Sequence, residues 1–489
     1  MKNIRSTIAI LAIALASITA DAKVTLPSVM GDNMVLQRDT QVNIWGKAAP
    51  KTKVTVTPSW DGRTYTTTAD SDGRWTTKVA TGNAGGPYSI TISDGEPVVL
   101  DNILLGEVWI CGGQSNMEMQ VHGFMHQPVA GGLEAILDAP NHPGMRFFTL
   151  GRSISDTPLY DCKGEWLQST PEAVADFSAC GYFFGHLLNQ MLGVPVGLIT
   201  SNWGGTCVEP WMDEAAFEAV EGIDKSVSRG RTDANQVVGH LYNGMIHPIE
   251  NHTAKGFIWY QGESNRGYHD DYVKLLSAMI TDWRNKWGDK EMPFYMAQLA
   301  PYRYDGAEKM SLPMIIEAQY KVAAEVPNVG IAATTDIGNP IGIHPSHKKE
   351  VGERLAFLAL QRDYGVKGLP LPAPTYKSMS VEGNKVTLEF NNLAFDQDWW
   401  EGNTFHSYLD ARYIRPQGFE VAGEDRVFYP ATGGFGHGKN TIEIYSDSVP
   451  NPVAVRYYFH NYMPDANVKT CLGQPLVPFR TDNWPVKID

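Results

Sequence analysis

The sequence predicts an α/β protein in which a parallel sheet, covered by helices on both faces, is flanked by β-sandwich segments. Thr- and Val-rich alternation fills residues 23–100 and returns after residue 370, a pattern typical of antiparallel strands. Between these regions, strand-like runs such as KGFIWYQGESN alternate with helical stretches such as DDYVKLLSAMITDWRNKWG. That alternation is typical of parallel strands joined by crossover helices. At 489 residues the chain is too long for one compact core.

The N-terminus has the layout of a signal peptide. Basic Lys2 and Arg5 precede an apolar run over residues 8–18, and small residues follow at Ala20 and Ala22. These three parts in this order predict a signal peptide over residues 1–22. No later stretch approaches the roughly 18–20 apolar residues that cross a membrane. We therefore expect an exported protein, periplasmic or secreted, without a membrane span.

The remaining segments follow from changes in periodicity. We expect an N-terminal β-sandwich over 23–100, an α/β domain over 101–365, a β-rich second sandwich or insert over 366–460 and an extended C-terminal strap over 461–489. The turn signals Asp61-Gly62 and Asp72-Gly73 divide the first sandwich into short strands. The Pro-rich end of the chain is expected to lie across an earlier domain.

Charge and cysteine content narrow the class of partner and cofactor. The formal net charge is −14 with no long basic run, which argues against nucleic acid and anionic membranes as partners. The five cysteines lack C-x-x-C spacing, so neither a zinc nor a redox motif is predicted. Cys162 and Cys180 are a pair that could form a disulfide. His122 and His126 lie four residues apart, but in a Gly-broken loop without H-E-x-x-H, so no metal site is predicted there.

Polar residues follow four strand-like runs of the α/β domain. Ser115 lies in GGQSNM, and the other three sites are SNWGGT, QGESN and DIGNPIGIH. Functional residues of open parallel sheets gather at the carboxyl ends of the strands. A serine, a carboxylate and a histidine on one such edge can build a hydrolytic triad. Glycine-rich backbone beside them can donate N–H groups to a developing oxyanion.

These motifs resemble a known family. GEVWICGGQSNMEM, SNWGGTCVEPWM, FIWYQGESN and IHPSHKKEVGERLA, together with GFEVAGEDRVFYPA in the later β-rich segment, are similar to the sialate O-acetylesterases among the SGNH hydrolases. The resemblance runs from about residue 24 to the end. It implies an SGNH-type three-layer hydrolase domain and a serine esterase that removes O-acetyl groups from carbohydrates, sialic acids in first place. Acetylated xylan or another plant polysaccharide is the alternative substrate, and no metal or organic cofactor is required.

The resemblance also implies catalytic roles. Ser115 corresponds to the nucleophile and His344 to the general base. Many SGNH enzymes carry an aspartate three residues before the histidine, and Ile341 occupies that position here. Glu263 in WYQGESN is the preferred replacement, and Asp336 at the end of the preceding strand is the alternative. A Ser–His dyad with backbone support is the third option.

Further residues of the motifs are candidates for binding. The candidate oxyanion donors are the backbone amides of Ser115 and of Gly204 or Gly205, and the side chain of Asn265. The candidate substrate-binding residues are Gln114, Gln261 and Trp203. The amides could bind sugar hydroxyl groups, and the indole could stack on a sugar face.

The sequence is also compatible with other classes of protein. A non-catalytic carbohydrate-binding surface protein would use the two sandwiches and the aromatic segment DQDWWEGNTFHSY. The carboxylate missing before His344 favours this class, whereas Ser115, Glu263 and His344 on one sheet edge oppose it. A lipase is disfavoured because no long apolar lid is present, and a phosphodiester hydrolase because no cluster of metal ligands is evident.

Overall fold

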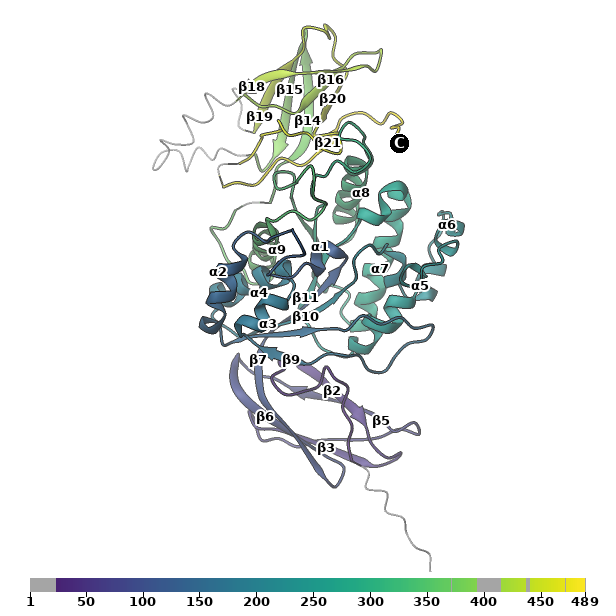
Figure 1. Ribbon diagram of the computed structural model, residues 1–489, viewed down its shortest axis with the longest axis vertical. Helices are drawn as coiled ribbons and strands as arrows, with labels where there is room; N and C mark the ends of the chain where they lie inside the picture. The colour runs from purple at the N-terminus through teal and green to yellow at the C-terminus, as the bar shows by residue number, and fades with distance from the viewer. Residues whose placement is uncertain (1–22, 371, 394–414, 437–439, 471, 489) are drawn as a thin grey trace, which may run out of the picture.

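The computed structural model describes residues 23–370, 372–393, 415–436, 440–470 and 472–488. The expected signal peptide, Cys471 and the segment DQDWWEGNTFHSY lie outside the described residues. Figure 1 shows three parts arranged along the long axis, with β-strands at both ends and an α/β domain between them. The predicted fold class is confirmed: a mostly parallel central sheet with helices is accompanied by antiparallel sheets.

The N-terminal part is built from short strands that pair antiparallel, except β1, which pairs in parallel with the long strand that follows them. Its strands are β1 (Val35–Gln37), β2 (Gln41–Lys47), β3 (Lys53–Pro58), β4 (Tyr65–Thr68), β5 (Arg74–Ala80) and β6 (Gly85–Ser93). β2 pairs with β5, and β3 pairs with both β4 and β6. Alternation explains the packing, since Val54 and Val56 of β3 are buried whereas Lys53, Thr55 and Thr57 are exposed or partly exposed.

Strand β7 (Pro97–Gly113) is 17 residues long and belongs to two parts of the molecule. Its first half pairs antiparallel with β6. Its second half is the central strand of the parallel sheet, between β10 (Val196–Asn202) and β11 (Gly256–Tyr260). The boundary expected between residues 100 and 101 therefore falls inside one continuous strand.

The central sheet has the strand order β13-β12-β11-β7-β10-β8-β9. The additional strands are β8 (Met145–Thr149), β9 (Trp166–Gln168), β12 (Phe294–Ala297) and β13 (Val329–Ala332). All neighbours in this order pair in parallel except β8 and β9, which pair antiparallel at the edge. Every residue of β10, β11 and β12 is buried, as expected for strands covered on both faces.

Helices lie on both sides of this sheet (Figure 1). α4 packs against α9 on one side, whereas α7 contacts α8 and α5 on the other. The α-helices are α1 (Ser115–Glu118), α2 (Gly132–Asp138), α3 (Pro171–Asp176), α4 (Ala179–Leu192), α5 (Glu214–Glu218), α6 (Lys225–Arg229), α7 (His269–Trp287), α8 (Ser311–Glu325) and α9 (Lys348–Arg362). Shorter helical turns are η1 (Ala139–Asn141), η2 (Glu209–Trp211), η3 (Ala234–Gln236), η4 (Tyr242–Ile246), η5 (His247–Ile249) and η6 (Glu263–Tyr268).

The C-terminal part consists of two four-stranded antiparallel sheets around a separate hydrophobic core. Their strands are β14 (Thr375–Glu382), β15 (Lys385–Asn391), β16 (Phe419–Ala422), β17 (Phe428–Pro430), β18 (Thr432–Phe435), β19 (Thr441–Tyr445), β20 (Ala454–Tyr457) and β21 (Phe479–Arg480). The end of the chain joins this part to the α/β domain. Arg480 of β21 bonds Glu317 of α8 at 2.8 Å, and Lys469 bonds Asp336 at 3.0 Å.

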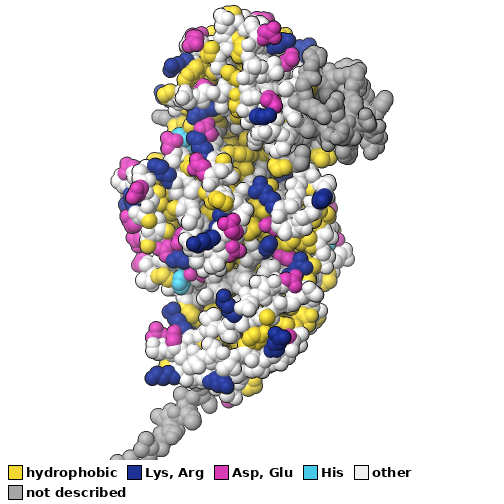
Figure 2. All heavy atoms as spheres, turned by 180° about the vertical axis from the view of Figure 1, so that it is seen from behind, with side chains coloured by type: hydrophobic (Ala, Val, Ile, Leu, Met, Phe, Trp, Pro, Cys, Tyr) yellow, Lys and Arg dark blue, Asp and Glu magenta, His cyan; other side chains and the backbone are white. Residues whose placement is uncertain are grey.

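The surface carries charges of both signs, and the described cysteines are unpaired. Figure 2 shows acidic and basic side chains interspersed over one face of the molecule. Among the described residues, we find no helix whose length and hydrophobicity would suit a membrane span. The four described cysteines are free and buried, so Cys162 and Cys180 do not form the disulfide considered above.

Candidate active site

The nucleophile candidate stands at the carboxyl end of β7. Gly113 has a φ of +146°, and a Cβ at this position would overlap the carbonyl oxygen of Tyr260 on β11. Glycine is therefore required for the turn. Ser115 then begins α1 and is half-buried, whereas Asn116 and Met117 behind it are fully buried. As the first residue of a helix, Ser115 has an amide N–H without an intrahelical acceptor.

His344 lies in the loop that precedes α9 and is held by two side chains of another loop. Its Nδ1 lies 2.7 Å from Oε1 of Gln127, and Phe124 packs edge-on at 5.2 Å between ring centroids. Because an amide oxygen only accepts, Nδ1 carries the proton and Nε2 keeps its lone pair. Burial lowers the pKa of His344 to about 4, and the Lys348 ammonium acts in the same direction. The imidazole is therefore neutral at pH 7 and able to accept a proton.

Asn116 joins the serine turn to the histidine loop. Its Nδ2 donates to the carbonyl oxygen of Ile343 at 3.2 Å and to Oε1 of Glu263 at 2.6 Å. Its Oδ1 accepts a hydrogen bond from the buried Lys348 ammonium. Since Asn116 follows Ser115 and Ile343 precedes His344, this one side chain fixes the two backbone segments that carry the candidate nucleophile and base.

Glu263 forms its hydrogen bond with Asn116 and not with the imidazole ring of His344. Its Oε1 accepts from Asn116, and its Oε2 is buried without a hydrogen-bond partner among the described residues. Burial raises the pKa of Glu263, and the hydrogen bond from Asn116 opposes that rise. Burial also lowers the pKa of Lys348 to about 8. A triad requires Nδ1–H of His344 to donate to a carboxylate, but this N–H donates to Gln127 and not to Glu263.

Asp336, the alternative acid, is held elsewhere. Its two oxygens accept from the Arg354 guanidinium at 2.7 and 2.8 Å, and Lys469 adds a third bond at 3.0 Å. These partners outweigh burial and hold the pKa of Asp336 below its usual range. Both oxygens of Asp336 are thus paired with cationic side chains. At His344, the amide of Gln127 takes the place in which the sequence predicts a carboxylate.

The candidate oxyanion donors differ in their availability. The N–H of Gly204 donates to Oε2 of Glu118 at 2.9 Å, so it already has an acceptor, whereas Gly205 is exposed. Asn265 is fully buried. Its Nδ2 donates to Glu209 at 3.1 Å, and its Oδ1 accepts from the Val208 amide at 3.0 Å. The structure therefore directs the Asn265 side chain into the protein and away from any substrate.

The three candidate substrate-binding residues differ in their exposure. Gln261 is fully buried. It donates to Asn265 at 2.7 Å and accepts from Tyr272 at 3.0 Å. The prediction that Gln261 contacts the sugar directly is therefore wrong. Gln114 is buried as well, and its Oε1 accepts from the Gly262 amide at 3.1 Å. This bond ties together the strand ends of β7 and β11. Trp203 is half-buried, and its contact with a sugar stays a prediction.

The sequence reasoning missed the residues that hold His344. Gln127 is 217 positions away in the sequence, and a glutamine in a loop carries no periodic signal. The loop is shaped by Gly123 and by the paired backbone bonds between Phe124 and Gln127, at 2.9 and 3.0 Å. It is fixed to the histidine segment by the Ala130 amide, which donates to the Ser346 carbonyl at 2.9 Å.

A half-buried serine and a neutral histidine at the carboxyl edge of a parallel sheet are typical of one class of protein, the serine hydrolases. The structure matches the crystal structure of a carbohydrate acetylesterase from Xanthomonas citri with a TM-score of 0.82 and 36% identity, over 94% of this chain and 100% of that chain. The family model described as carbohydrate esterase, sialic acid-specific acetylesterase, matches residues 105–361. The chain belongs to this family.

Curated relatives agree with the assignment. The sialate O-acetylesterase of Mus musculus is 28% identical over 454 residues, which cover 80% of this chain and 82% of the relative. The sialate O-acetylesterase of Homo sapiens is 29% identical over 411 residues, 76% of each chain. The resemblance found in the motifs is confirmed, and the protein is an esterase rather than a non-catalytic carbohydrate-binding protein.

Proposed function

We propose that this chain removes O-acetyl groups from sialic acids, with Ser115 as the nucleophile and His344 as the general base. The observation that supports this most directly is the Asn116 junction. It ties the half-buried Ser115 at the end of β7 to the loop of a neutral His344. A hydrolytic pair needs these two groups on adjacent rigid segments.

The chemistry follows from the tautomer of His344. Nδ1–H donates to Gln127, so Nε2 takes the proton of Ser115 as its Oγ attacks the acetyl carbonyl carbon. The same Nε2–H then protonates the departing sugar oxygen. Water, deprotonated by Nε2, then attacks the acetyl carbon of the acetyl-enzyme. The Nε2–H returns this proton to Oγ of Ser115 as acetate leaves, which restores the free serine and the neutral histidine. Gln127 acts as a positioning residue in place of a carboxylate.

The developing negative charge needs backbone donors. We assign this role to the amides of Ser115 and Gly205, since the amide of Gly204 donates to Glu118. Each preorganised donor of this kind contributes about 3 kcal/mol to the transition state. Glu263 supports the pair indirectly: it orients Asn116 and supplies a negative charge near the buried Lys348.

A charged side chain bound to α1, the helix that begins at Ser115, bears on the choice of substrate. Arg152 is exposed, lies 5.1 Å from the centroid of the Trp203 ring and donates to Glu118 at 2.9 Å. A guanidinium on an aromatic face is suited to the carboxylate of a sialic acid. Because Glu118 already offsets its charge, a neutral acetylated plant polysaccharide is the second candidate substrate.

Acetate release from a substrate panel tests the proposal. The purified chain is offered O-acetylated sialic acid, acetylated xylan and a small aryl acetate. The Ser115→Ala variant is compared with Ser380→Ala, which changes an exposed serine on β14. We expect kcat/KM to fall at least about 10³-fold in Ser115→Ala and to stay unchanged in Ser380→Ala. Full activity of Ser115→Ala refutes the mechanism. Preference for xylan refutes the assigned sugar and leaves the mechanism intact.

A further inference from the structure

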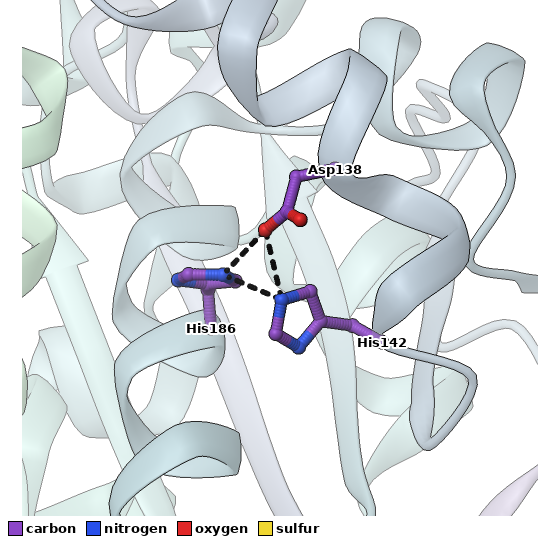
Figure 3. Close-up of side chains that lie close together, drawn as sticks. All are labelled: Asp138, His142 and His186. Carbon is purple, nitrogen blue, oxygen red and sulfur yellow. Dashed lines mark hydrogen bonds and ion pairs between the residues drawn. The ribbon is translucent and has the colours of Figure 1, made fainter.

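Three potential metal ligands converge at a distance from the esterase residues. Asp138 ends α2, His142 follows the short turn η1, and His186 lies on α4. Figure 3 shows their side chains directed at one another. Nε2 of His142 lies 2.9 Å from Oδ2 of Asp138 and 3.0 Å from Nε2 of His186, and the third separation is 3.5 Å.

Neighbouring residues fix the orientation of two of these ligands. Nδ1 of His142 donates to Oδ1 of Asn189 at 3.1 Å, and Asn189 in turn donates to the Val194 carbonyl at 2.8 Å. Asn141 donates to Oδ1 of Asp138 at 2.8 Å, so Oδ2 is the oxygen presented to the histidines. Such outer partners orient the ligands in protein metal sites.

The three facing atoms are Nε2 of His142, Oδ2 of Asp138 and Nε2 of His186, and each of them can offer a lone pair. Nδ1 of His142 donates to Asn189, which leaves Nε2 as the atom that this ring presents to the other two. A proton on Nε2 of His142 would satisfy its contact with Asp138 at 2.9 Å. A cation bound by the three atoms would satisfy all three contacts together.

The geometry points to a binding site for a divalent transition-metal ion, Zn²⁺ by preference, formed by Asp138, His142 and His186. Tetrahedral Zn²⁺ with bonds of 2.0–2.1 Å requires ligand atoms about 3.3 Å apart, close to the three separations given above. Two imidazoles and one carboxylate, with a further position open to water, are a donor set that suits Zn²⁺. Mg²⁺ and Ca²⁺ prefer six or more oxygen ligands, which this cluster does not offer.

A metal ion at this site would stabilise the fold and would take no part in ester hydrolysis. A bound ion would join α2 and η1 to α4, and α2 follows directly on the loop that carries Gln127. No step of the proposed hydrolysis uses it, so its test is independent of the esterase mechanism.

The test is a binding titration of the tag-free, EDTA-dialysed chain. Zn²⁺ is added in competition with a chromophoric chelator, and Co²⁺ is added separately to follow its visible absorption. We expect one equivalent of each ion to bind. Affinity should fall at least 100-fold in His186→Ala and about tenfold in Asn189→Ala, where the partner of a ligand is lost.

The matched control is His240→Ala, because His240 forms a single histidine–carboxylate pair with Asp156 at 2.9 Å and should leave Zn²⁺ binding unchanged. Thermal unfolding in EDTA shows whether each variant folds, and His186→Gln replaces His186→Ala if the latter does not. Equal affinity in the wild type and in a folded His186 variant overturns the site. Displacement of Zn²⁺ by equimolar Mg²⁺ or Ca²⁺ overturns the assigned class of ion.

Discussion

The amide of Gln127 accepts a hydrogen bond from Nδ1 of His344 at 2.7 Å, so its replacement tests how the histidine is held. Gln127→Ala leaves that N–H without its acceptor in a half-buried site. An unpaired buried donor costs about 1–3 kcal/mol. At 1.36 kcal/mol for each factor of ten in rate, kcat is expected to fall about 5- to 150-fold while the fold is retained.

Gln127→Glu changes the same contact in the opposite sense. A carboxylate on Nδ1 favours the imidazolium, because a charge-assisted hydrogen bond contributes about 1–2 kcal/mol more than a neutral one. The pKa of His344, which burial lowers to about 4, should therefore rise by roughly one unit. A general base works in its neutral form, so a higher pKa moves the acid limb of the kcat/KM profile to higher pH.

The assay is kcat/KM for a small aryl acetate from about pH 3.5 to about pH 8, with wild type, Gln127→Ala, Gln127→Glu and the control Gln168→Glu. Gln168 is exposed on β9, so the control adds the same charge away from the histidine. Wild-type kcat in Gln127→Ala would refute the positioning role. So would an acid limb in Gln127→Glu that does not differ from that of the control.

Three further substitutions test the surroundings of the site, and a fourth tests a buried histidine that contacts Val35 of β1. Asp336→Asn leaves the partner guanidinium uncompensated and should cost about 3–5 kcal/mol of unfolding free energy in urea without changing kcat per folded molecule. Glu263→Gln should lower kcat about tenfold and should cost less unfolding free energy than Asp336→Asn. A loss of kcat in Asp336→Asn but not in Glu263→Gln would restore Asp336 as the catalytic acid. Gly204→Ala places a methyl group 3.1 Å from Cβ of Ser115 and should lower kcat/KM about 100-fold; unchanged kinetics would show that the turn tolerates it. Burial lowers the pKa of His252 to about 4, so the unfolded chain takes up a proton between pH 6.5 and 4 that the folded chain refuses, and about 3 kcal/mol of stability should be lost as the pH falls through that window. Urea unfolding of wild type and His252→Asn at both ends of the window checks this, and equal losses in the two would assign the effect to other groups.

The sequence predicts the fold and the position of Ser115 because those depend on local signals. Alternation in β3 and buried runs in β10 and β11 specify their strands, and the glycine before Gln114 specifies the turn. Parallel strands then bring their carboxyl ends to one edge whatever the loops do. This is why motifs far apart in the chain could be placed together before the structure was known.

Partner choice among polar side chains could not be predicted in the same way. Asp336 accepts hydrogen bonds from Arg354, and Asn265 donates one to Glu209. Each of these pairings depends on tertiary distances of a few ångströms. Burial then decides whether a polar group can contact a ligand at all, as for Gln261. The spacing of Asp138 and His142 was visible in the sequence, but their approach to His186 was not.

The continuity of β7 has a consequence for how the molecule can be divided. One unbroken backbone runs from the antiparallel pairing with β6, through the centre of the parallel sheet, to the turn that presents Ser115. Detaching the N-terminal part between β6 and the central sheet would cut β7, the strand that leads to Ser115. Tension applied to the N-terminal sheet would be carried along covalent bonds to Ser115, the proposed nucleophile. The N-terminal strands and the central sheet are therefore mechanically coupled through the backbone of β7.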